Sequence, residues 1–553
     1  YKTIGCPFIS KSHRYMNRLG ILFTSFCLLS CLVSCQKEKL EPINPGKGIL
    51  NFSLLKSDNP SLSEDVVCAI SEDGIITGTF PELLGDYHLI PRFEYDCEYV
   101  TSSSRLQISG TTVQDFSKPV VYEAKMMDGT FREYTVKMSF PVKPSLPVIK
   151  IETKNGAQIL DKKNYINGKI TISDPDALYW DVPELVLEMT EKGIRGRGNT
   201  TWDMPKKPYK IKLDKKVSIF NLPADKEWVL LANYSDKTLL RNVVAMKLSK
   251  IVGMKWTPAM LPVEVYLNND YLGCYTFSEH KKVAKHRIDL NIVSDTDNTG
   301  DLVTGDYYFE IESRMDEATC FLSEINHLPM MFKDPEYPTP EQLSYVKAYF
   351  RDAELALNGS DFMSTTKGWQ KYIDAESFAK AFIVNELTKN IDGNMRKSSF
   401  ITKQRGKKLE MYFLWDYDLT LGNCDYMASL SGGVASNGPE GWFVKTTSMD
   451  QGINWYIRLS QDPAFCAKVK EIWNKVYPQF KEVPSVIDKQ AWLIDDAQTR
   501  NFQRWDILNT YVWPNMVVTG KYSSEIAYLK DFYLKRLEWL NTKFNIKEGE
   551  IFK

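Results

Sequence analysis

The sequence predicts an α+β protein in which a small all-β domain precedes a larger mixed domain. Short alternating runs between polar turns fill residues 49–140, which is typical of a β-sandwich. Strand patterns then dominate residues 147–312, and helical periodicity dominates residues 313–545. At 553 residues the chain exceeds what one hydrophobic core usually serves, so we expect two or three domains.

The first 35 residues are predicted to comprise an upstream extension and a signal peptide. A basic Arg18 precedes an apolar run at 21–33 that is too short to span a membrane comfortably. The run ends in Leu-Val-Ser-Cys, which resembles a bacterial lipobox, so Cys35 is the predicted lipidation site. An overlapping Leu-Leu-Ser-Cys that ends at Cys31 and an ordinary signal peptide without lipid are the alternatives. Residues 36–48 are polar and predict a tether, and Gln36 after the Cys favours a lipid anchor in the outer membrane.

Within the all-β domain, strands are predicted at 75–80 and 133–140. The stretch 108–138 resembles the small immunoglobulin-like modules of Bacteroidetes surface lipoproteins, which implies an Ig-like sandwich. Cys68 and Cys97 could pair in an oxidising compartment, although isolated buried thiols are the simpler interpretation. Pro141, Pro144 and Pro147 mark a linker to the next domain.

The mixed domain begins with strands over 148–190 and continues with clear strand and helix patterns. A strand-rich part followed by a helix-rich part suggests two lobes with a cleft between them. Further strands are predicted at 209–213, 228–232, 263–267, 271–277 and 307–311, with a helix near 237–251. Later helices are predicted at 341–357 and 375–389, from Asp462 to about Tyr477, and in the last apolar-faced segment around 529–544.

The composition argues against a nucleic-acid-binding protein and against a metal site built on His or Cys. The formal net charge of -1 argues against a broad electrostatic surface for nucleic acid. The chain has only five His, at scattered positions, and the six Cys beyond residue 35 show no zinc-binding spacing. A metal site built on His or Cys is therefore not expected.

Acidic residues in NIDG and WDYD give the strongest indication of chemistry. Asp392 lies in a turn signal, where a purely structural role is the alternative.

Asp416 and Asp418 end an apolar run, and on a strand this spacing places both on one face. Two such carboxylates repel each other unless a cation or hydrogen-bond donors lie between them. Mg²⁺ takes one or two carboxylates together with phosphate oxygens, so the pair predicts a magnesium site. A calcium site or an Arg-paired structural cluster is the alternative.

Two basic segments are candidates for holding phosphate. GIRGRGNTTW, at 193–202, combines glycines with Arg195 and Arg197, although it matches no established phosphate-loop pattern and a structural turn is the alternative. In the following KKPYKIKLD, Lys210 and Lys212 share one strand face. A solvated face is the common fate of such lysines.

Three further polar positions have local interpretations. Asp236, in NYSDKTLLRN, is predicted to cap the helix near 237–251. Asn268-Asn269-Asp270 predicts a hairpin turn, and Glu279 ends the second strand of that hairpin.

Six segments in consistent order resemble the CotH kinase family, named after spore coat protein H. They are RGRGNTTW, KKPYKIKLDKK, LPADKEWVLLANYSDKTLLRN, VEVYLNNDYLGCYTFSE, FIVNELTKNIDG and LWDYDLTLG. The resemblance covers roughly residues 150–545. It implies an atypical protein-kinase-like, two-lobed fold that uses ATP and Mg²⁺ to phosphorylate protein hydroxyl groups.

The resemblance also implies residue roles. Asp392 corresponds to the catalytic-loop Asp that accepts the substrate hydroxyl proton. Asp416 corresponds to the metal-binding Asp, and Asp418 is a candidate second ligand. Lys397 replaces the Asn that many members have five residues after the catalytic Asp, although Asn394 lies nearby, and HRD is absent. The resemblance predicts nucleotide contacts from Arg197, Asn199, the Lys-rich strand with Lys207, Lys210 and Lys212, and Glu279 where a kinase hinge begins. Asp236 and Arg241 match a motif of the family that is expected to support the fold.

The sequence therefore predicts a Mg²⁺-dependent, ATP-using phosphotransferase, an atypical protein Ser/Thr kinase, on an exported lipoprotein of the cell envelope. The alternative is a surface adhesin, or a glycan- or protein-binding lipoprotein, with an idle kinase-like domain. Scarce ATP outside the inner membrane and adhesin roles among fungal relatives favour that alternative. Transfer of AMP is a third hypothesis.

Overall fold

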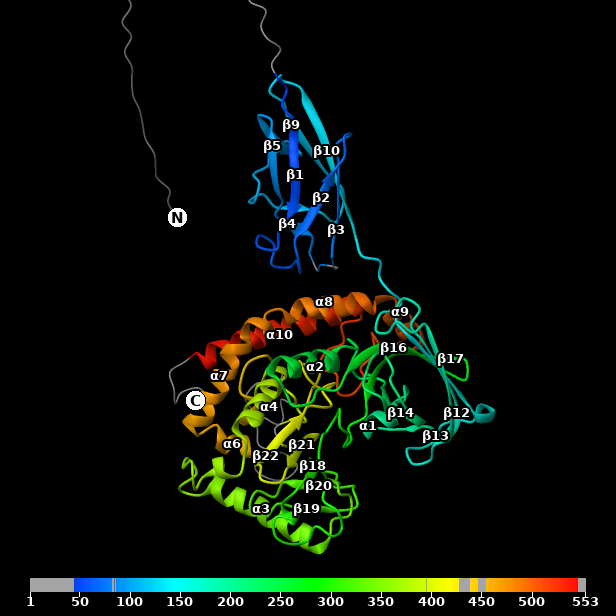
Figure 1. Ribbon diagram of the computed structural model, residues 1–553, viewed down its shortest axis with the longest axis vertical. Helices are drawn as coiled ribbons and strands as arrows, with labels where there is room; N and C mark the ends of the chain where they lie inside the picture. The colour runs from blue at the N-terminus through cyan, green and yellow to red at the C-terminus, as the bar shows by residue number, and fades with distance from the viewer. Residues whose placement is uncertain are drawn as a thin grey trace, which may run out of the picture.

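The computed structural model describes residues 44–81, 84, 86–393, 395–426, 438–445 and 454–545. The predicted signal peptide, the lipidation site Cys35, most of the tether and Asn394 lie outside these residues. Within the described residues, no helix combines the length and the apolar character needed to cross a membrane. The mixed α+β class predicted from the sequence is confirmed (Figure 1).

Residues 48–139 form an all-β unit whose main sheet has eight strands in the order β5-β1-β2-β3-β10-β9-β6-β7. Neighbouring strands are antiparallel except β3 and β10, which pair in parallel. Alternate side chains fill one core, including Phe52, Tyr122 and Val136. Cys68 and Cys97 are buried free thiols, as the simpler interpretation predicts. The strands are β1 (Gly48–Leu54), β2 (Val66–Ile70), β3 (Ile75–Thr79), β5 (Arg92–Asp96), β6 (Tyr99–Ser102), β7 (Arg105–Leu106), β9 (Val120–Lys125) and β10 (Phe131–Ser139), with the separate pair β4 (His88–Leu89) and β8 (Gln114–Asp115).

Residues 148–279 form a closed barrel in the strand order β11-β12-β13-β14-β15-β17-β16. Parallel pairing of β11 with β16 closes it, and its other neighbours are antiparallel. The predicted hairpin turn is confirmed, because Asn268 and Asn269 have positive φ and join β16 to β17. The strands are β11 (Val148–Thr153), β12 (Ile166–Ser173), β13 (Glu184–Gly196), β14 (Tyr209–Val217), β15 (Asp225–Leu231), β16 (Met260–Leu267) and β17 (Asp270–Glu279).

The remaining chain builds a five-stranded sheet, β19-β20-β18-β21-β22, surrounded by helices. This sheet includes strands on both sides of residue 312, where the sequence prediction divides strand-rich from helix-rich parts. Its strands are β18 (Tyr307–Ile311), β19 (Cys320–Leu322), β20 (Pro329–Asp334), β21 (Ser399–Lys403) and β22 (Leu409–Phe413). The helices are α1 (Thr200–Asp203), α2 (Arg241–Val252), α3 (Pro340–Asn358), α4 (Ala375–Thr388), α6 (Trp455–Leu459), α7 (Pro463–Phe480), α8 (Val483–Leu493), α9 (Asp495–Arg504) and α10 (Tyr522–Phe544). Short 3-10 turns are η1 (Lys154–Gly156), η2 (Leu302–Thr304), η3 (Trp369–Lys371) and η4 (Phe443–Lys445).

The C-terminal helices return to the barrel, where α9 lies against β17 (Figure 1). Arg500 on α9 makes two hydrogen bonds to the Glu264 carboxylate on β16, at 2.8 and 2.7 Å. The buried Lys206 donates to Asn501 Oδ1 at 2.7 Å and to the Cys274 carbonyl at 2.5 Å. These bonds fix the barrel against the C-terminal helices, so groups from both can form one site.

Candidate functional site

One open pocket brings the acidic loops together with the glycine-rich turn. Asp392, Asp416 and Asp418 line it, together with Arg197 and Asn199 from the turn between β13 and β14. A smaller pocket adjoins it, shares Arg197, Trp415 and both WDYD acids, and continues to Pro208, Leu231 and Ala232. The site therefore has a charged centre and a smaller extension toward the barrel, which polar side chains such as Asn233 and Asn242 also line.

The WDYD acids reach this pocket from a loop and not from a strand. β22 ends at Phe413, and Asp416 has a φ of 71°, in the left-handed region. The prediction of two same-face carboxylates on a strand is therefore wrong, because the backbone turns before it reaches them. Asp416 is exposed and accepts a hydrogen bond from Ser398 Oγ at 3.3 Å, whereas Asp418 is half-buried.

The three carboxyl groups affect one another electrostatically. Burial raises the pKa of Asp418 well above its usual range, and the charges of Asp416 and Asp392 raise it further. Burial also raises the pKa of Asp392, while Lys397 acts in the opposite direction. A cation among these groups would relieve the repulsion that their proximity creates.

Asp392 lies in the turn that follows α4. Its backbone N–H donates to Asn390 Oδ1 at 3.1 Å, and its carbonyl accepts from the Lys397 N–H at 2.9 Å. Its buried Oδ1 has no hydrogen-bond partner among the described residues. Arg396 lies 3.9 Å from that oxygen. The carboxylate therefore has unused acceptor capacity inside the pocket.

Four basic side chains line the same pocket: Arg197, Lys281, Arg314 and Lys397. Burial lowers the pKa of Arg197 and the charge of Asp416 opposes that shift, while its guanidinium lies 5.8 Å from the centre of the Trp415 ring. Lys281 lies two residues after the end of β17, and its Nζ is 2.9 Å from Glu310 Oε1 on β18. Lys281 and Glu310 were not predicted from the sequence, because a Lys after a strand is ordinarily a solvated residue.

The predicted Lys-rich strand does not contribute to this pocket. Lys207 Nζ donates to the Trp202 carbonyl at 2.6 Å. Lys210 and Lys212 pair with Glu227 on β15, at 2.7 and 3.5 Å. Of these three lysines, none is among the residues that line the pocket with the acids.

Glu279 has its partners outside this pocket. Its Oε2 accepts a hydrogen bond from the Ala259 N–H at 3.1 Å, and its Oε1 lies 3.6 Å from Arg287 Nε. It is not among the residues that line the pocket. Asn199, by contrast, lines the pocket as expected from its segment.

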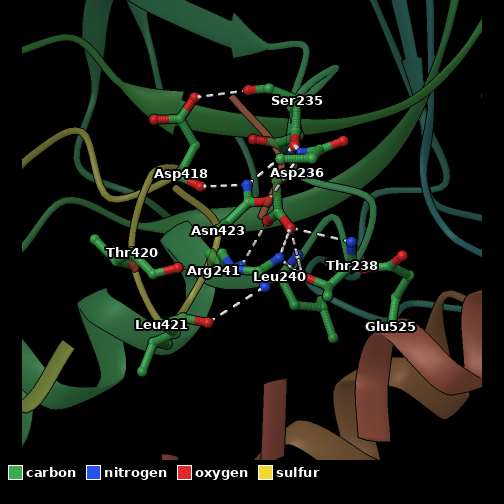
Figure 2. A network of polar contacts seen from close by, with 12 residues as sticks. Ser235, Asp236, Thr238, Leu240, Arg241, Asp418, Thr420, Leu421, Asn423 and Glu525 are labelled. Atoms are coloured by element: carbon green, nitrogen blue, oxygen red, sulfur yellow. Dashed lines mark hydrogen bonds and ion pairs between the residues drawn. The ribbon is translucent and has the colours of Figure 1, made fainter. Parts of the chain in front are cut away.

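The motif around Asp236 supports the acidic loop (Figure 2). α2 begins at Arg241 with Leu240 as N-cap residue, so Asp236 does not cap it in the predicted position. Its carboxylate instead accepts from the Arg241 N–H at 2.9 Å and from the Arg241 guanidinium at 2.6 Å. Arg241 then donates to the carbonyls of Thr420 and Leu421, at 2.9 and 3.4 Å.

Further hydrogen bonds hold the same loop on both sides of Asp418. Asn242 Oδ1 accepts from the Tyr417 N–H at 2.8 Å. Ser235 Oγ donates to Asp418 Oδ2 at 3.3 Å, and Asn423 Nδ2 donates to the carbonyls of Ser235 and Asp418 (Figure 2). The segment 233–242 therefore fixes the position of the acids without supplying a charged group to the pocket itself.

Magnesium chemistry is compatible with this donor set. Among the described residues, no group of three or more His, Cys, Asp or Glu is placed to hold a metal ion. Mg²⁺ does not require such a cage, because it is commonly bound through one or two carboxylates together with water and substrate phosphates. Asp416 and Asp418 fit that requirement.

Comparison with known proteins identifies the family. The family model described as CotH kinase protein matches residues 194–540. This chain belongs to the CotH kinase protein family. The matched region contains the three acids and the cations that line the pocket, and the family indicates a kinase-like domain.

The structural comparisons are too weak to support an argument. A crystal structure from Bacteroides fragilis, provisionally described as a secreted protein, has 15% identity and a TM-score of 0.14, and the match covers 18% of this chain and 98% of that one. A second, from Bacteroides thetaiotaomicron and provisionally described as a glycoside hydrolase, has 16% identity and a TM-score of 0.15. That match covers 31% of this chain and 53% of the other, so it spans about half of that structure. No curated protein matches the chain.

Proposed function

We propose that this CotH-family protein is a Mg²⁺-dependent, ATP-using phosphotransferase, an atypical protein Ser/Thr kinase, that acts as a lipid-anchored protein of the cell envelope. The observation that supports this function is the placement of Asp392 in one pocket with Asp416 and Asp418. Asp392 precedes Asp416 by 24 positions in the sequence, and the three acids line the same pocket as several cationic side chains. Phosphoryl transfer depends on this combination of positioning and charge compensation.

Each group has a role in the proposed reaction. Asp392, whose Oδ1 accepts no hydrogen bond among the described residues, orients the acceptor hydroxyl and takes its proton. Asp416 and Asp418 would hold Mg²⁺, which supplies charge compensation for the phosphates when it is bound. Arg197 and Lys281 lie where they can offset the remaining phosphate charge. The adjoining pocket, where Leu231 and Ala232 lie beside Asn233, would receive the nucleotide base.

The test is the variant Asp416→Ala in the full chain. Because Asp416 is exposed, we expect the fold to be retained while calorimetric binding of ATP with Mg²⁺ is lost. Asp531→Ala is the matched control, since Asp531 is an exposed acid on α10 that pairs only with Lys535 among the described residues. Unchanged ATP binding in the Asp416 variant would remove the proposal.

Mass spectrometry of an acceptor protein incubated with ATP separates the reaction types. A phosphoryl group adds about 80 Da and an AMP group about 329 Da, which follows from the transferred atoms. Absence of nucleotide binding by the unaltered chain would instead favour a surface-binding protein with an idle kinase-like domain.

A further inference from the structure

Two aromatic rings stack at the edge of the pocket that carries Asp392. The rings of Tyr426 and Trp513 have centroids 5.8 Å apart and planes inclined by only 10°. Both residues line the pocket. Trp513 nevertheless remains 48% exposed, although the large side chain of a Trp usually buries most of its surface in a folded protein. The exposed part of its ring is therefore available to a ligand in the pocket.

The backbone on both sides of the stack is fixed to the acidic loop. The Asp425 N–H donates to the Pro514 carbonyl at 2.9 Å, which joins the neighbours of the two rings. Asn515 Nδ2 donates to the Ser235 carbonyl at 2.6 Å and to Asn423 Oδ1 at 2.9 Å. Since Ser235 and Asn423 also bind Asp418, the stack and the acids form one connected framework.

Further apolar side chains accompany the stack. Met204 and Leu419 line the same pocket as the two rings. Three neighbours of Trp513 in the sequence are also exposed, namely Tyr511, Met516 and Val518. Exposed apolar patches on a folded protein commonly mark an interaction site.

The proposed function favours a polypeptide as the occupant. A protein Ser/Thr kinase must hold the polypeptide around its acceptor residue, and the stack lines the same pocket as Asp392. Met204 and Leu419 line that pocket as well, so a large apolar side chain of the acceptor gains from burial against them and against the exposed Trp513 ring. Polar side chains of the same pocket can form hydrogen bonds with the backbone of the acceptor.

We propose that the Trp513–Tyr426 stack docks an aromatic or other large apolar side chain of a polypeptide acceptor, close to the Ser or Thr whose hydroxyl reaches Asp392. This inference deepens the proposed phosphotransfer and rests on it for the role of Asp392. The proposed function assigns the nucleotide base to the smaller adjoining pocket at Leu231 and Ala232, which leaves the stack to the acceptor.

The experiment measures peptide binding to the full chain by fluorescence anisotropy. The probes are labelled Ser-containing peptides that are identical except for Phe or Ala at one position, moved stepwise from three residues before the Ser to three after it. Stacking beyond simple area burial corresponds to about a 3- to 10-fold gain. We therefore expect one or two Phe positions to strengthen binding by at least about threefold.

Three variants locate the effect. Trp513→Ala is expected to abolish the preference for Phe, and Trp513→Phe to retain most of it because a flat ring remains. Tyr337→Ala is the matched control, since Tyr337 is an exposed aromatic residue outside the pocket. Thermal unfolding of each variant checks that the fold is intact, and the comparison of Phe and Ala peptides on the unaltered chain keeps the inference falsifiable if Trp513→Ala fails to fold.

Equal binding of the Phe and Ala peptides, or a preference that survives the loss of Trp513 in a folded variant, would overturn the inference. Tight binding of an oligosaccharide panel, lost in Trp513→Ala, would overturn the assignment to polypeptides. Calorimetry with ATP and Mg²⁺ is run in parallel. A Phe preference without nucleotide binding would contradict the phosphotransfer proposal and leave the docking surface supported.

Discussion

At the scale of single residues, Arg241 connects the fold to the acidic loop. Its guanidinium is almost completely buried and touches both the Asp236 carboxylate and two carbonyls of the loop. A buried charge of this kind depends on its partner, because no water replaces the partner when it is removed.

Asp236→Ala is expected to lower the free energy of unfolding by about 3–5 kcal/mol, because it leaves the Arg241 charge unpaired inside the protein. The measurement is the midpoint of urea denaturation. Asp531→Ala removes the partner of Lys535, and this pair is exposed on both sides, so its loss should cost only about 0–1 kcal/mol. Equal effects of the two variants would show that the Asp236 pair does not stabilise the fold.

Lys206 gives the protein a pH-dependent stability. Burial lowers its pKa to about 7, whereas an unfolded Lys titrates near 10.5. Between these values the unfolded state binds more protons than the folded state, so this residue makes stability rise with pH from about 7 to 10.5. Below pH 7 the folded protein must carry the buried charge and gains nothing from this group.

Lys206→Met should therefore reduce the slope of unfolding free energy against pH by about 1 kcal/mol per pH unit between pH 7.5 and 9.5. Denaturant titrations at several pH values give this slope. The exposed Lys535→Met serves as control and is expected to keep the slope of the unaltered protein. A Lys206 variant with the same slope would contradict a lowered pKa at this position.

At the scale of elements, the N-terminus of α2 positions the loop that follows β22. The Tyr417 N–H between the two WDYD acids donates to Asn242 Oδ1, and both groups are buried. The loop contains Asp416, whose φ lies in the left-handed region, and within the described residues it does not pair with a strand. Side-chain hydrogen bonds therefore take the place of the backbone hydrogen bonds that would fix a strand in a sheet.

Asn242→Ala is expected to weaken binding of ATP with Mg²⁺ by roughly tenfold and to lower stability by about 1–3 kcal/mol, because the Tyr417 N–H loses its acceptor. Calorimetry measures the first effect and denaturation the second. Ser249→Ala, at the other end of α2, removes a buried hydroxyl that contacts Thr257. It should lower stability without changing nucleotide binding, and a similar binding loss there would contradict a local effect.

At the scale of the whole molecule, the linker after the all-β unit belongs physically to the larger part. Leu146 is buried in its largest core, and the Pro147 carbonyl accepts from the Glu264 N–H at 2.9 Å. Lys143 lies 3.0 Å from Asp496 on α9. The sequence prediction begins the kinase-like domain at 147, at the last of three prolines, and so leaves the contacts of Leu146 and Lys143 outside it.

We therefore predict that a shortened chain beginning at residue 141 binds ATP with Mg²⁺ as the full chain does. A chain beginning at 148 should be less stable by about 2–3 kcal/mol, since it loses the burial of Leu146. Denaturation midpoints of the two shortened chains, compared at equal concentration, test this. Equal midpoints would show that the linker residues do not stabilise the larger part.

Many elements follow from the sequence because their signals are local. Strand β18 was expected at its observed bounds, and Asp462 caps α7 through a hydrogen bond to the Ala464 N–H. The Asn-Asn hairpin turn needs only two residues that tolerate positive φ. Closure of the barrel was not predictable in this way, because the parallel pair β11 and β16 joins segments more than 100 residues apart.

Residue order and short spacings are enough to indicate the family, the mixed fold class and the three acids. Which cations accompany the acids depends on the folded chain. Lys210 and Lys212 carry the expected charge, but both pair with Glu227 on the neighbouring strand, while Lys281 reaches the pocket beside Glu310. Which lysines reach the pocket depends on which strands become neighbours. Strand pairing joins segments that are far apart in the sequence, so local sequence patterns do not predict it.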